Sequence, residues 1–292
     1  MDYIKYYDEI VLHRQSCRNF SDKKVEQNVI SDIEAYYTSC KPLVEDIATE
    51  LVFIDGERAP MLGASVGYNG FIIKAPQYFV ILSETKEHYL ENVGFVAQGI
   101  TLKLTQLGID ACWLTINDAA FAKKALKLDS EKEVAAVVAF GYKNKEVKDI
   151  RLDIASPSNV NMRKSGLKPA PKISLSDLLY HKSYGAEFDK SNLYSDLEYG
   201  LRAVSEAQSF FNRQPYRIIV DDAFISLIGI QDDMTSDSDM LLNFGIAMFN
   251  FYAVMEETRS EAPTWSFESP NVAAKIGSRV GKECRSRWSP YH

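Results

Sequence analysis

The sequence predicts an α+β fold built from two related halves, in a chain of 292 residues. Segments with helical spacing of apolar residues alternate with short apolar or β-branched runs that are typical of strands. A helix, a strand and then a long apolar helix occur in the same order in both parts of the chain. Both apolar helices begin with Asn-x-Gly, at Asn92 and at Asn243. We therefore predict an internal duplication, with halves at residues 1–185 and 186–292.

The elements of the first half are predicted from periodicity and from the residues that stop each run. Helical spacing predicts helices, Asp-Gly or a glycine ends the strands, and Gly108 ends the long helix. In chain order we expect helices at 3–14 and 28–40, strands at 51–54 and 75–82, a helix at 92–107, and strands at 111–114 and 134–140. Prolines and scattered serine and asparagine then predict a loop from Ile150 to Pro171.

The second half repeats this order in a shorter form. We expect a helix at 193–211, a strand at 217–220 and an apolar helix at 240–257, whose aromatic residues pack in the core between the halves. No clear counterpart of the strand at 75–82 is expected in this half.

Composition and charge argue against several classes of protein. The net charge of −7 is unfavourable for a general nucleic-acid binder, because phosphate binding needs a basic face. The four cysteines contain no CxxC pair, which argues against a disulfide framework or a zinc site and predicts no bound metal. The acidic start is unlike a signal peptide, and the longest apolar stretch, 241–255, is shorter than the ~20 residues of a membrane span. We expect a cytoplasmic protein without nucleic-acid or membrane partners.

Two polar clusters stand out because neither recurs in the other half. The first, here called the Arg-Ser-Arg cluster, is Arg14-Gln15-Ser16-Cys17-Arg18, and its two guanidinium groups and hydroxyl form a donor set that suits a phosphate. From these five residues alone, a solvated and charged helix end is the alternative interpretation. The second cluster, at 212–216, is a compact polar turn that runs into a strand. The asymmetry suggests one composite site built from both halves.

The first cluster carries a resemblance to a known family. The motif Arg14-x-Ser16-x-Arg18-x-Phe20 resembles the N-terminal signature of the nitroreductase superfamily, whose flavin-dependent α/β members bind FMN at a dimer interface. The resemblance implies that Arg14, Gln15, Ser16 and Arg18 hold the FMN phosphate and ribityl chain. It also implies a nitroreductase-like fold for the chain.

Other segments resemble the same superfamily in the expected order. Residues 94–99 and 107–113 are similar to its central helix and to the Gly-x-x-x-Cys-Trp segment that follows, and 137–142 is similar to its late central strand. A second family stretch, Ala-Pro-Ser-x-x-Asn-x-Gln-Pro-Trp, reaches the flavin that the partner subunit binds. Residues 41–45 do not match this stretch, whereas 207–216 do.

The chain therefore resembles the tandem, single-chain branch of the superfamily, in which two halves form an intramolecular pseudo-dimer. Because the second half has no Arg-x-Ser-x-Arg, the resemblance implies one complete FMN site. Two positions, Gln208 and Tyr216, depart from the proline and tryptophan of the family motif. The residues of this stretch that the resemblance places near the flavin are Gln208, Ser209, Asn212 and Gln214.

Five further positions follow from the resemblance. Backbone amides at Leu114 and Thr115 are implied near flavin N5, where fixed dipoles stabilise the charge that reduction puts on the ring. Arg163 and Lys164 fit the place of the basic residues that complete the phosphate cage. Asn69 fits a polar position at the pyrimidine edge of the flavin, and it fits equally well as a turn residue beside a glycine.

The predicted function is that of an FMN-dependent oxidoreductase. NADH or NADPH passes a hydride to the flavin, which then reduces a nitroaromatic, a quinone or a similar small-molecule acceptor. No side chain is expected to act as a catalytic acid, base or nucleophile, and the pseudo-dimer is expected to be a monomer. One alternative is a degenerate member that binds flavin or another ligand without turnover. Another is a serine hydrolase that uses Ser65 of the Gly-x-Ser-x-Gly pattern at 63–67, although that mechanism needs a strand directly before the motif and a helix directly after it.

Overall fold

The chain forms two compact units in the computed structural model. The first unit spans His13–Ala170, and the second, here called the split unit, combines Met1–Leu12 with Pro171–His292. The boundary expected at 185 therefore falls inside the split unit. The described residues are 4–68, 72–146, 150–156, 159–164, 170–189, 193, 195–221, 224–259, 262–267 and 280–287, with the backbone alone described for 150–156, 159–164 and 280–287.

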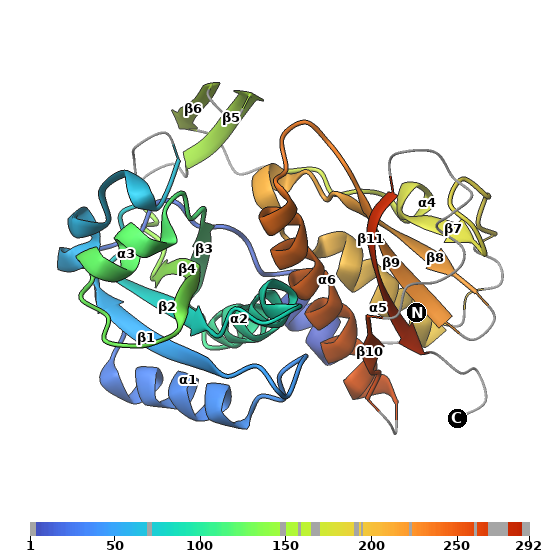
Figure 1. Ribbon diagram of the computed structural model, residues 1–292, viewed down its shortest axis with the longest axis horizontal. Helices are drawn as coiled ribbons and strands as arrows, with labels where there is room; N and C mark the ends of the chain where they lie inside the picture. Colours follow the sequence, from blue (N-terminus) through green and yellow to red (C-terminus); the bar gives the residue numbers. More distant parts are fainter. Residues whose placement is uncertain are drawn as a thin grey trace. The chain divides into compact units, whose positions relative to one another are not determined.

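The 13–170 unit contains a four-stranded antiparallel sheet and a separate hairpin (Figure 1). The strands of the sheet follow the order β1-β2-β4-β3, so that β3 lies at one edge. Strands β5 and β6 pair only with each other among the described residues. The elements in chain order are α1 (Gln27–Ser39), β1 (Thr49–Asp55), the 3₁₀ helix η2 (Gly56–Ser65), β2 (Gln77–Ser83), α2 (Tyr89–Gln106), β3 (Asp110–Leu114), α3 (Ala119–Ala125), β4 (Glu133–Gly141), β5 (Ile150–Ser156) and β6 (Asn159–Lys164).

The central strands of this sheet are buried on both faces, which is why they read as continuous apolar runs in the sequence. Tyr78, Val80 and Leu82 of β2 point into a core that also contains Ala122 of α3. The alternate residues of β2 point to the other face, where the ring of Phe79 lies 6.2 Å from that of Phe140. Helix α2 contacts β2, β3 and β4 and supplies further apolar surface. The sheet is therefore a middle layer between helical elements.

A Schellman motif ends helix α2 and directs the chain into β3. The amide of Ile109 donates to the carbonyl of Leu104 at 2.9 Å, and the amide of Gly108 donates to that of Thr105 at 3.0 Å. Gly108 has a φ of 74°, a left-handed conformation that glycine adopts without steric cost. The predicted end of this helix is confirmed, and β3 starts at Asp110, two residues after Gly108.

The split unit contains a five-stranded sheet in the order β10-β11-β9-β8-β7 (Figure 1). Strands β7 and β8 are parallel, and the other neighbouring pairs are antiparallel. Its elements are the π-helical segment η1 (Tyr6–Val11), α4 (Leu175–Leu178), β7 (Leu179–His181), α5 (Ser195–Glu206), the short 3₁₀ helix η4 (Phe210–Asn212), β8 (Tyr216–Val220), β9 (Phe224–Ile230), α6 (Asp237–Thr258), β10 (Trp265–Ser266) and β11 (Val280–Arg287).

The first residues of the chain belong to the split unit because η1 packs against α5 and α6. The ring of Tyr7 lies 5.3 Å from that of Tyr199 in an edge-to-face arrangement, and burial raises the pKa of Tyr7 to about 12. The amide of Tyr6 donates to a carboxylate oxygen of Glu257 at 2.7 Å. Tyr7 is one of the apolar positions from which the sequence predicted a helix at 3–14.

The middle of helix α6, residues 243–251, is buried throughout, as its apolar sequence predicted. Ser236 caps its N-terminus by accepting a hydrogen bond from the amide of Asp239 at 3.1 Å. No helix in the described part of the chain is both long enough and apolar enough to span a membrane.

Three expectations about secondary structure are wrong. The helix expected at 193–211 ends at Glu206, and residues 207–209 are not helical. The loop predicted from Ile150 to Pro171 contains the hairpin β5–β6, because apolar residues alternate along both strands. The split unit also has a strand where no counterpart of 75–82 was expected. Strand β9 pairs antiparallel with β8, just as β2 pairs antiparallel with β1.

We predict that Gly108→Ala lowers the free energy of unfolding by about 1 kcal/mol, because a Cβ is disfavoured in the left-handed conformation. Chemical denaturation monitored by circular dichroism measures the change. Gly108→Asn is the matched control, since asparagine tolerates this conformation better and should cost less. Equal losses for the two variants would contradict this explanation.

Candidate flavin site

The Arg-Ser-Arg cluster lies along the free edge of β3. Ser16 forms a parallel bridge with Ala111, and the amide of Cys17 donates to the carbonyl of Ala111 at 3.0 Å. Cys17 is only 1% exposed and points into the core. Because alternate residues of an extended segment share a side, this orientation turns Arg14, Ser16 and Arg18 away from the core, and all three are half-buried.

The same edge strand leads to Leu114 and Thr115. Leu114 pairs with Val137 of β4, and the carbonyl of Thr115 accepts a hydrogen bond from the amide of Gly67 at 2.8 Å. Thr115 lies four residues beyond Ala111, which corresponds to about 13 Å of extended chain. The fold thus brings the cluster and the Leu114–Thr115 segment to one strand, separated by a length that suits an elongated ligand.

Three other predicted residues are less closely defined. Arg163 and Lys164 are the last residues of β6, where they pair with Arg151 and Ile150 of β5. Because of this pairing they lie in a hairpin and not in the predicted loop. The structure describes only their backbone. Asn69 lies outside the described residues.

The second cluster forms a turn in the split unit, here called the 209–214 turn. Its backbone closes through two hydrogen bonds of 2.9 Å, from the amide of Asn212 to the carbonyl of Ser209 and from the amide of Arg213 to that of Phe210. The Ser209 hydroxyl accepts from the amide of Gln214 at 2.8 Å. Phe211, Asn212 and Gln214 all have φ between 47° and 58°. For residues other than glycine such conformations cost about 1–3 kcal/mol each, so the surroundings must support the turn.

Gln214 supports the turn from inside the unit. Its side chain is 3% exposed, and its Oε1 accepts a hydrogen bond from the amide of Ile173 at 2.8 Å. Its Nε2 donates to the carbonyl of Ser205 at 2.6 Å. The side chain that the sequence placed near a flavin ring is therefore engaged with the backbone of its own unit. Gln208 is also buried.

Lys172 is a member of this region that sequence reasoning missed. Its Nζ donates to the carbonyl of Ala207 and to Oδ1 of Asn212, both at 2.9 Å. The amide nitrogen of Asn212 donates in turn to the carbonyl of Pro171 at 2.8 Å. No motif marks Lys172, because its role depends on the 171–173 segment lying beside a turn that is distant in sequence.

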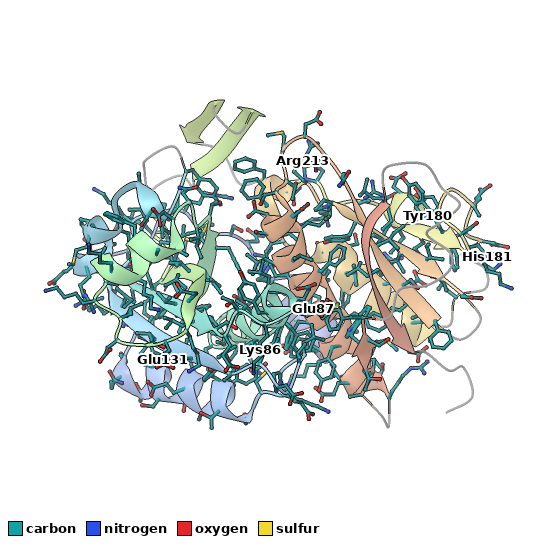
Figure 2. The ribbon with its side chains drawn as sticks, in the orientation of Figure 1. Lys86, Glu87, Glu131, Tyr180, His181 and Arg213 are labelled. Carbon is teal, nitrogen blue, oxygen red and sulfur yellow. The ribbon has the colours of Figure 1, made fainter. Side chains whose placement is uncertain are left out.

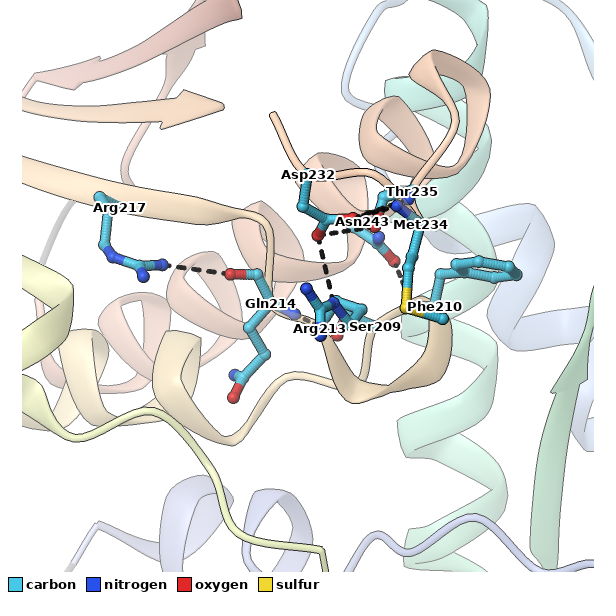
Figure 3. A network of polar contacts seen from close by, with 9 residues as sticks. All are labelled: Ser209, Phe210, Arg213, Gln214, Arg217, Asp232, Met234, Thr235 and Asn243. Carbon is cyan, nitrogen blue, oxygen red and sulfur yellow. Dashed lines mark hydrogen bonds and ion pairs between the residues drawn. The ribbon is translucent and has the colours of Figure 1, made fainter. Parts of the chain in front are cut away.

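An ion pair ties the outer side of the turn to the loop before α6 (Figure 3). Arg213, at the surface in Figure 2, lies 3.3 Å from the carboxylate of Asp232. That carboxylate also accepts hydrogen bonds from the amides of Met234 and Thr235 at 2.7 and 2.8 Å. Burial by itself raises the pKa of Asp232, but the hydrogen bonds and the guanidinium outweigh it, so this pKa lies below its ordinary value.

Ser65 does not stand in a nucleophile elbow. It is the last residue of the 3₁₀ helix η2 and is 5% exposed, and its hydroxyl donates to the carbonyl of Leu62 at 2.5 Å. The strand that the hydrolase mechanism needs directly before the serine is replaced by η2.

The donor set at the edge of β3 fits an anionic ligand. Ser16, which is bridged to β3, has an arginine two residues away on either side, and the alternation of extended backbone directs these three side chains to the same side. Within the described ranges, no group of three or more histidine, cysteine or acidic residues could hold a metal ion. The donor types of Arg14, Ser16 and Arg18 are those that suit a phosphate-like group.

Comparison with known proteins identifies the family. A family model described as "Putative TM nitroreductase" matches residues 7–254. The chain belongs to this nitroreductase family. No curated protein matches the sequence.

A solved structure that covers nearly the whole chain agrees with the assignment of the fold. A "putative nitroreductase" from Thermotoga maritima superimposes with a TM-score of 0.58 at 16% identity, covering 98% of this chain and 94% of that one. An FMN-dependent nitroreductase from Clostridium difficile has a TM-score of 0.41 at 22% identity and covers 48% and 90% of the two chains. A "putative NADH oxidase" from Clostridium acetobutylicum has a TM-score of 0.38 at 22% identity, with 46% and 88% covered. The predicted nitroreductase-like fold is confirmed.

We predict that Gln214→Leu lowers the free energy of unfolding by about 2–4 kcal/mol, because it leaves the amide of Ile173 and the carbonyl of Ser205 buried without their partner. Arg213→Ala in the same turn is the control, and it should cost no more than about 1 kcal/mol since its ion pair is partly exposed. Urea denaturation of the two variants provides the comparison. Similar losses would rule out an internal supporting role for Gln214.

We predict that Asp232→Asn destabilises the protein by about 1 kcal/mol at pH 7 and that this difference shrinks in acid. A carboxyl whose pKa is lowered by folding contributes stability above its unfolded pKa of about 3.9, and that contribution is lost as pH falls through the folded pKa. Denaturation curves at pH 7, 5 and 3 test this. A difference that stays constant over this range would contradict it.

Proposed function

We propose that the protein is an FMN-dependent oxidoreductase that oxidises NADH or NADPH and reduces a nitroaromatic, a quinone or a similar acceptor. The observation that carries the proposal is that the Arg-Ser-Arg cluster is bridged to the edge of β3 through Ser16, in a chain of the nitroreductase family. When bound, FMN would accept a hydride from the nicotinamide and deliver electrons to the acceptor. The protein supplies binding, orientation and electrostatics.

Different residues are proposed to bind the phosphate end and the ring end of the cofactor. Arg14 and Arg18 bind phosphate oxygens through their planar guanidinium groups, and the Ser16 hydroxyl donates one further hydrogen bond. Arg163 and Lys164 complete this end in the proposal. Gln15 falls on the other side of the segment by the same alternation, so its proposed contribution is made through its backbone. At the other end, the backbone at Leu114 and Thr115 provides fixed dipoles beside the ring, which stabilise developing negative charge without reorganisation. The residues proposed to complete the ring site are Asn69, Ser209 and Asn212. Gln208 and Gln214 are buried, so in the proposal they act through the shape of the turn and not by direct contact with the ring.

The proposal includes a duplicated chain with one flavin site per molecule. Each unit has a helix, an antiparallel strand pair and a long buried helix in that order: α1, β1–β2 and α2 in one, α5, β8–β9 and α6 in the other. In each, a strand that comes later in the chain, β4 or β11, pairs antiparallel with the second strand of the pair. This parallel supports two nitroreductase-like halves in one chain. The Arg-x-Ser-x-Arg motif occurs once, so one site is expected, in a cytoplasmic monomer.

Turnover separates this function from a degenerate member that binds flavin without reacting. The steady-state assay follows NADH and NADPH oxidation with menadione or a nitrofuran as acceptor. Oxidation that depends on both FMN and the acceptor supports the enzyme. Flavin binding without oxidation favours the degenerate alternative.

We predict that the purified protein, reconstituted with FMN, shows flavin absorption bands at about one flavin per chain. Arg18→Glu should abolish retention of FMN, because it places a carboxylate against the phosphate. Lys41→Glu is the control, since it makes the same charge change at an exposed helix end outside the cluster. Visible spectra after gel filtration report the stoichiometry. A yellow Arg18→Glu protein would show that the phosphate binds elsewhere.

A further inference from the structure

Two buried asparagines make the same contact at corresponding places in the two units. In α2, Oδ1 of Asn92 accepts a hydrogen bond from the amide of Val44 at 2.9 Å. In α6, Oδ1 of Asn243 accepts one from the amide of Phe210 at 3.1 Å. Val44 follows α1 and Phe210 follows α5, so each asparagine holds the loop between a helix and the antiparallel strand pair that comes after it. In both residues Nδ2 is buried and has no hydrogen-bond partner within the described ranges.

Asn243 holds the 209–214 turn at Phe210, whose other groups make further contacts within the turn. The carbonyl of Phe210 accepts from the amide of Arg213, and the ring of Phe210 stacks on that of Phe211 at 4.0 Å. Fixing the amide of Phe210 therefore constrains the backbone, the turn hydrogen bond and the stacked ring together. Phe211 and Gln214 adopt left-handed conformations that side chains with a Cβ disfavour, so the turn needs such external support.

Asn92 makes its bond to a segment of a different kind. Residues 41–45 carry none of the Asn-x-Gln-Pro pattern of the 209–214 turn. The amide of Val44 is nevertheless held by an asparagine that is 0% exposed, and Asn243 is 3% exposed. The two bonds are alike in geometry and burial, while the loops that they hold differ in chemistry. Loss of either bond should perturb folding to a similar extent. Only loss of the Asn243 bond should also perturb the ring site.

We propose that Asn243 is a positioning residue, which fixes the backbone of the 209–214 turn so that the turn already has its bound shape before FMN binds. Asn92 makes the equivalent bond and has no part in flavin binding. The proposal rests on the FMN-dependent function, because it assumes that this turn meets the ring. A loop held in its bound arrangement before binding saves the ordering cost that a mobile loop would incur on binding.

The experiment compares Asn243→Leu with Asn92→Leu in the full-length protein. Hydrogen–deuterium exchange in the absence of flavin reads the mobility of peptides that cover 207–216 and 41–47. Quenching of FMN fluorescence reads affinity. Asn243→Leu should speed exchange at 207–216 and weaken FMN binding about tenfold, the equivalent of one hydrogen bond. Asn92→Leu should speed exchange at 41–47 and leave FMN affinity within about twofold of wild type.

A second pair of variants tests the same bond from its donor side, in case Asn243→Leu does not fold. Phe210→Pro removes the amide hydrogen and the ring, whereas Phe210→Ala removes the ring alone. Ser209 has φ −148° and ψ 165°, an extended conformation that a following proline accepts. The first position of a short helix also accepts proline. Faster exchange and weaker FMN binding in Phe210→Pro than in Phe210→Ala would support the anchor.

The outcomes separate the two proposals. Wild-type protein that binds no FMN overturns the proposed function, while exchange at 207–216 still reports whether Asn243 holds the turn. Unchanged exchange at 207–216 in Asn243→Leu overturns the anchor. Wild-type FMN affinity in a variant whose turn has become mobile overturns the positioning role. Equal weakening of FMN binding by Asn243→Leu and Asn92→Leu overturns the assignment to one turn.

Discussion

The hydrogen bond from the amide of Cys17 to the carbonyl of Ala111 is the constraint on which the phosphate end of the candidate site depends. It attaches the segment to the free edge of β3, and the buried Cys17 side chain fixes which way the neighbouring residues face. Arg14, Ser16 and Arg18 then present their polar groups on one side through the alternation of extended backbone. Without this attachment the same three residues would be a charged surface segment, because long side chains in water have no preferred common direction.

The 209–214 turn shows the opposite arrangement, in which polar side chains point inward to hold a backbone shape. Gln214 satisfies buried backbone groups at Ile173 and Ser205, while Lys172 holds Asn212 from the adjacent segment. Three left-handed residues occur within four positions, a density that only a well-supported turn sustains. The family motif Asn-x-Gln-Pro is thus partly a structural motif. Its glutamine stabilises the turn from inside, whatever the turn contacts outside.

Local pattern predicted most helices and strands to within a few residues, but it missed hairpin β5–β6 and strand β9. Helices α1, α2 and α6 and strands β2 and β4 were predicted to within a few residues, since their apolar periodicity and end signals agree. Hairpin β5–β6 was missed because prolines outweighed a clear two-residue alternation. Strand β9 was missed although Phe224–Ile230 is apolar, because no glycine or proline directly before it marks a turn. The Arg-Ser-Arg cluster was found from residue types, whereas Lys172 and Asn243 depend on contacts between distant segments.

The sequence by itself determined the chemistry of the chain: the family motifs, the single Arg-x-Ser-x-Arg, the Asn-x-Gly starts of two helices and the apolar elements that form both cores. Only the tertiary structure decided which unit each end of the first half joins. Residues 1–12 and 171–181 belong with the later part of the chain, because η1 packs on α5 and α6 and β7 pairs with β8. A boundary predicted along the sequence cannot capture this exchange. Packing and strand pairing are set by complementary surfaces in space, and residues far apart in the chain supply them.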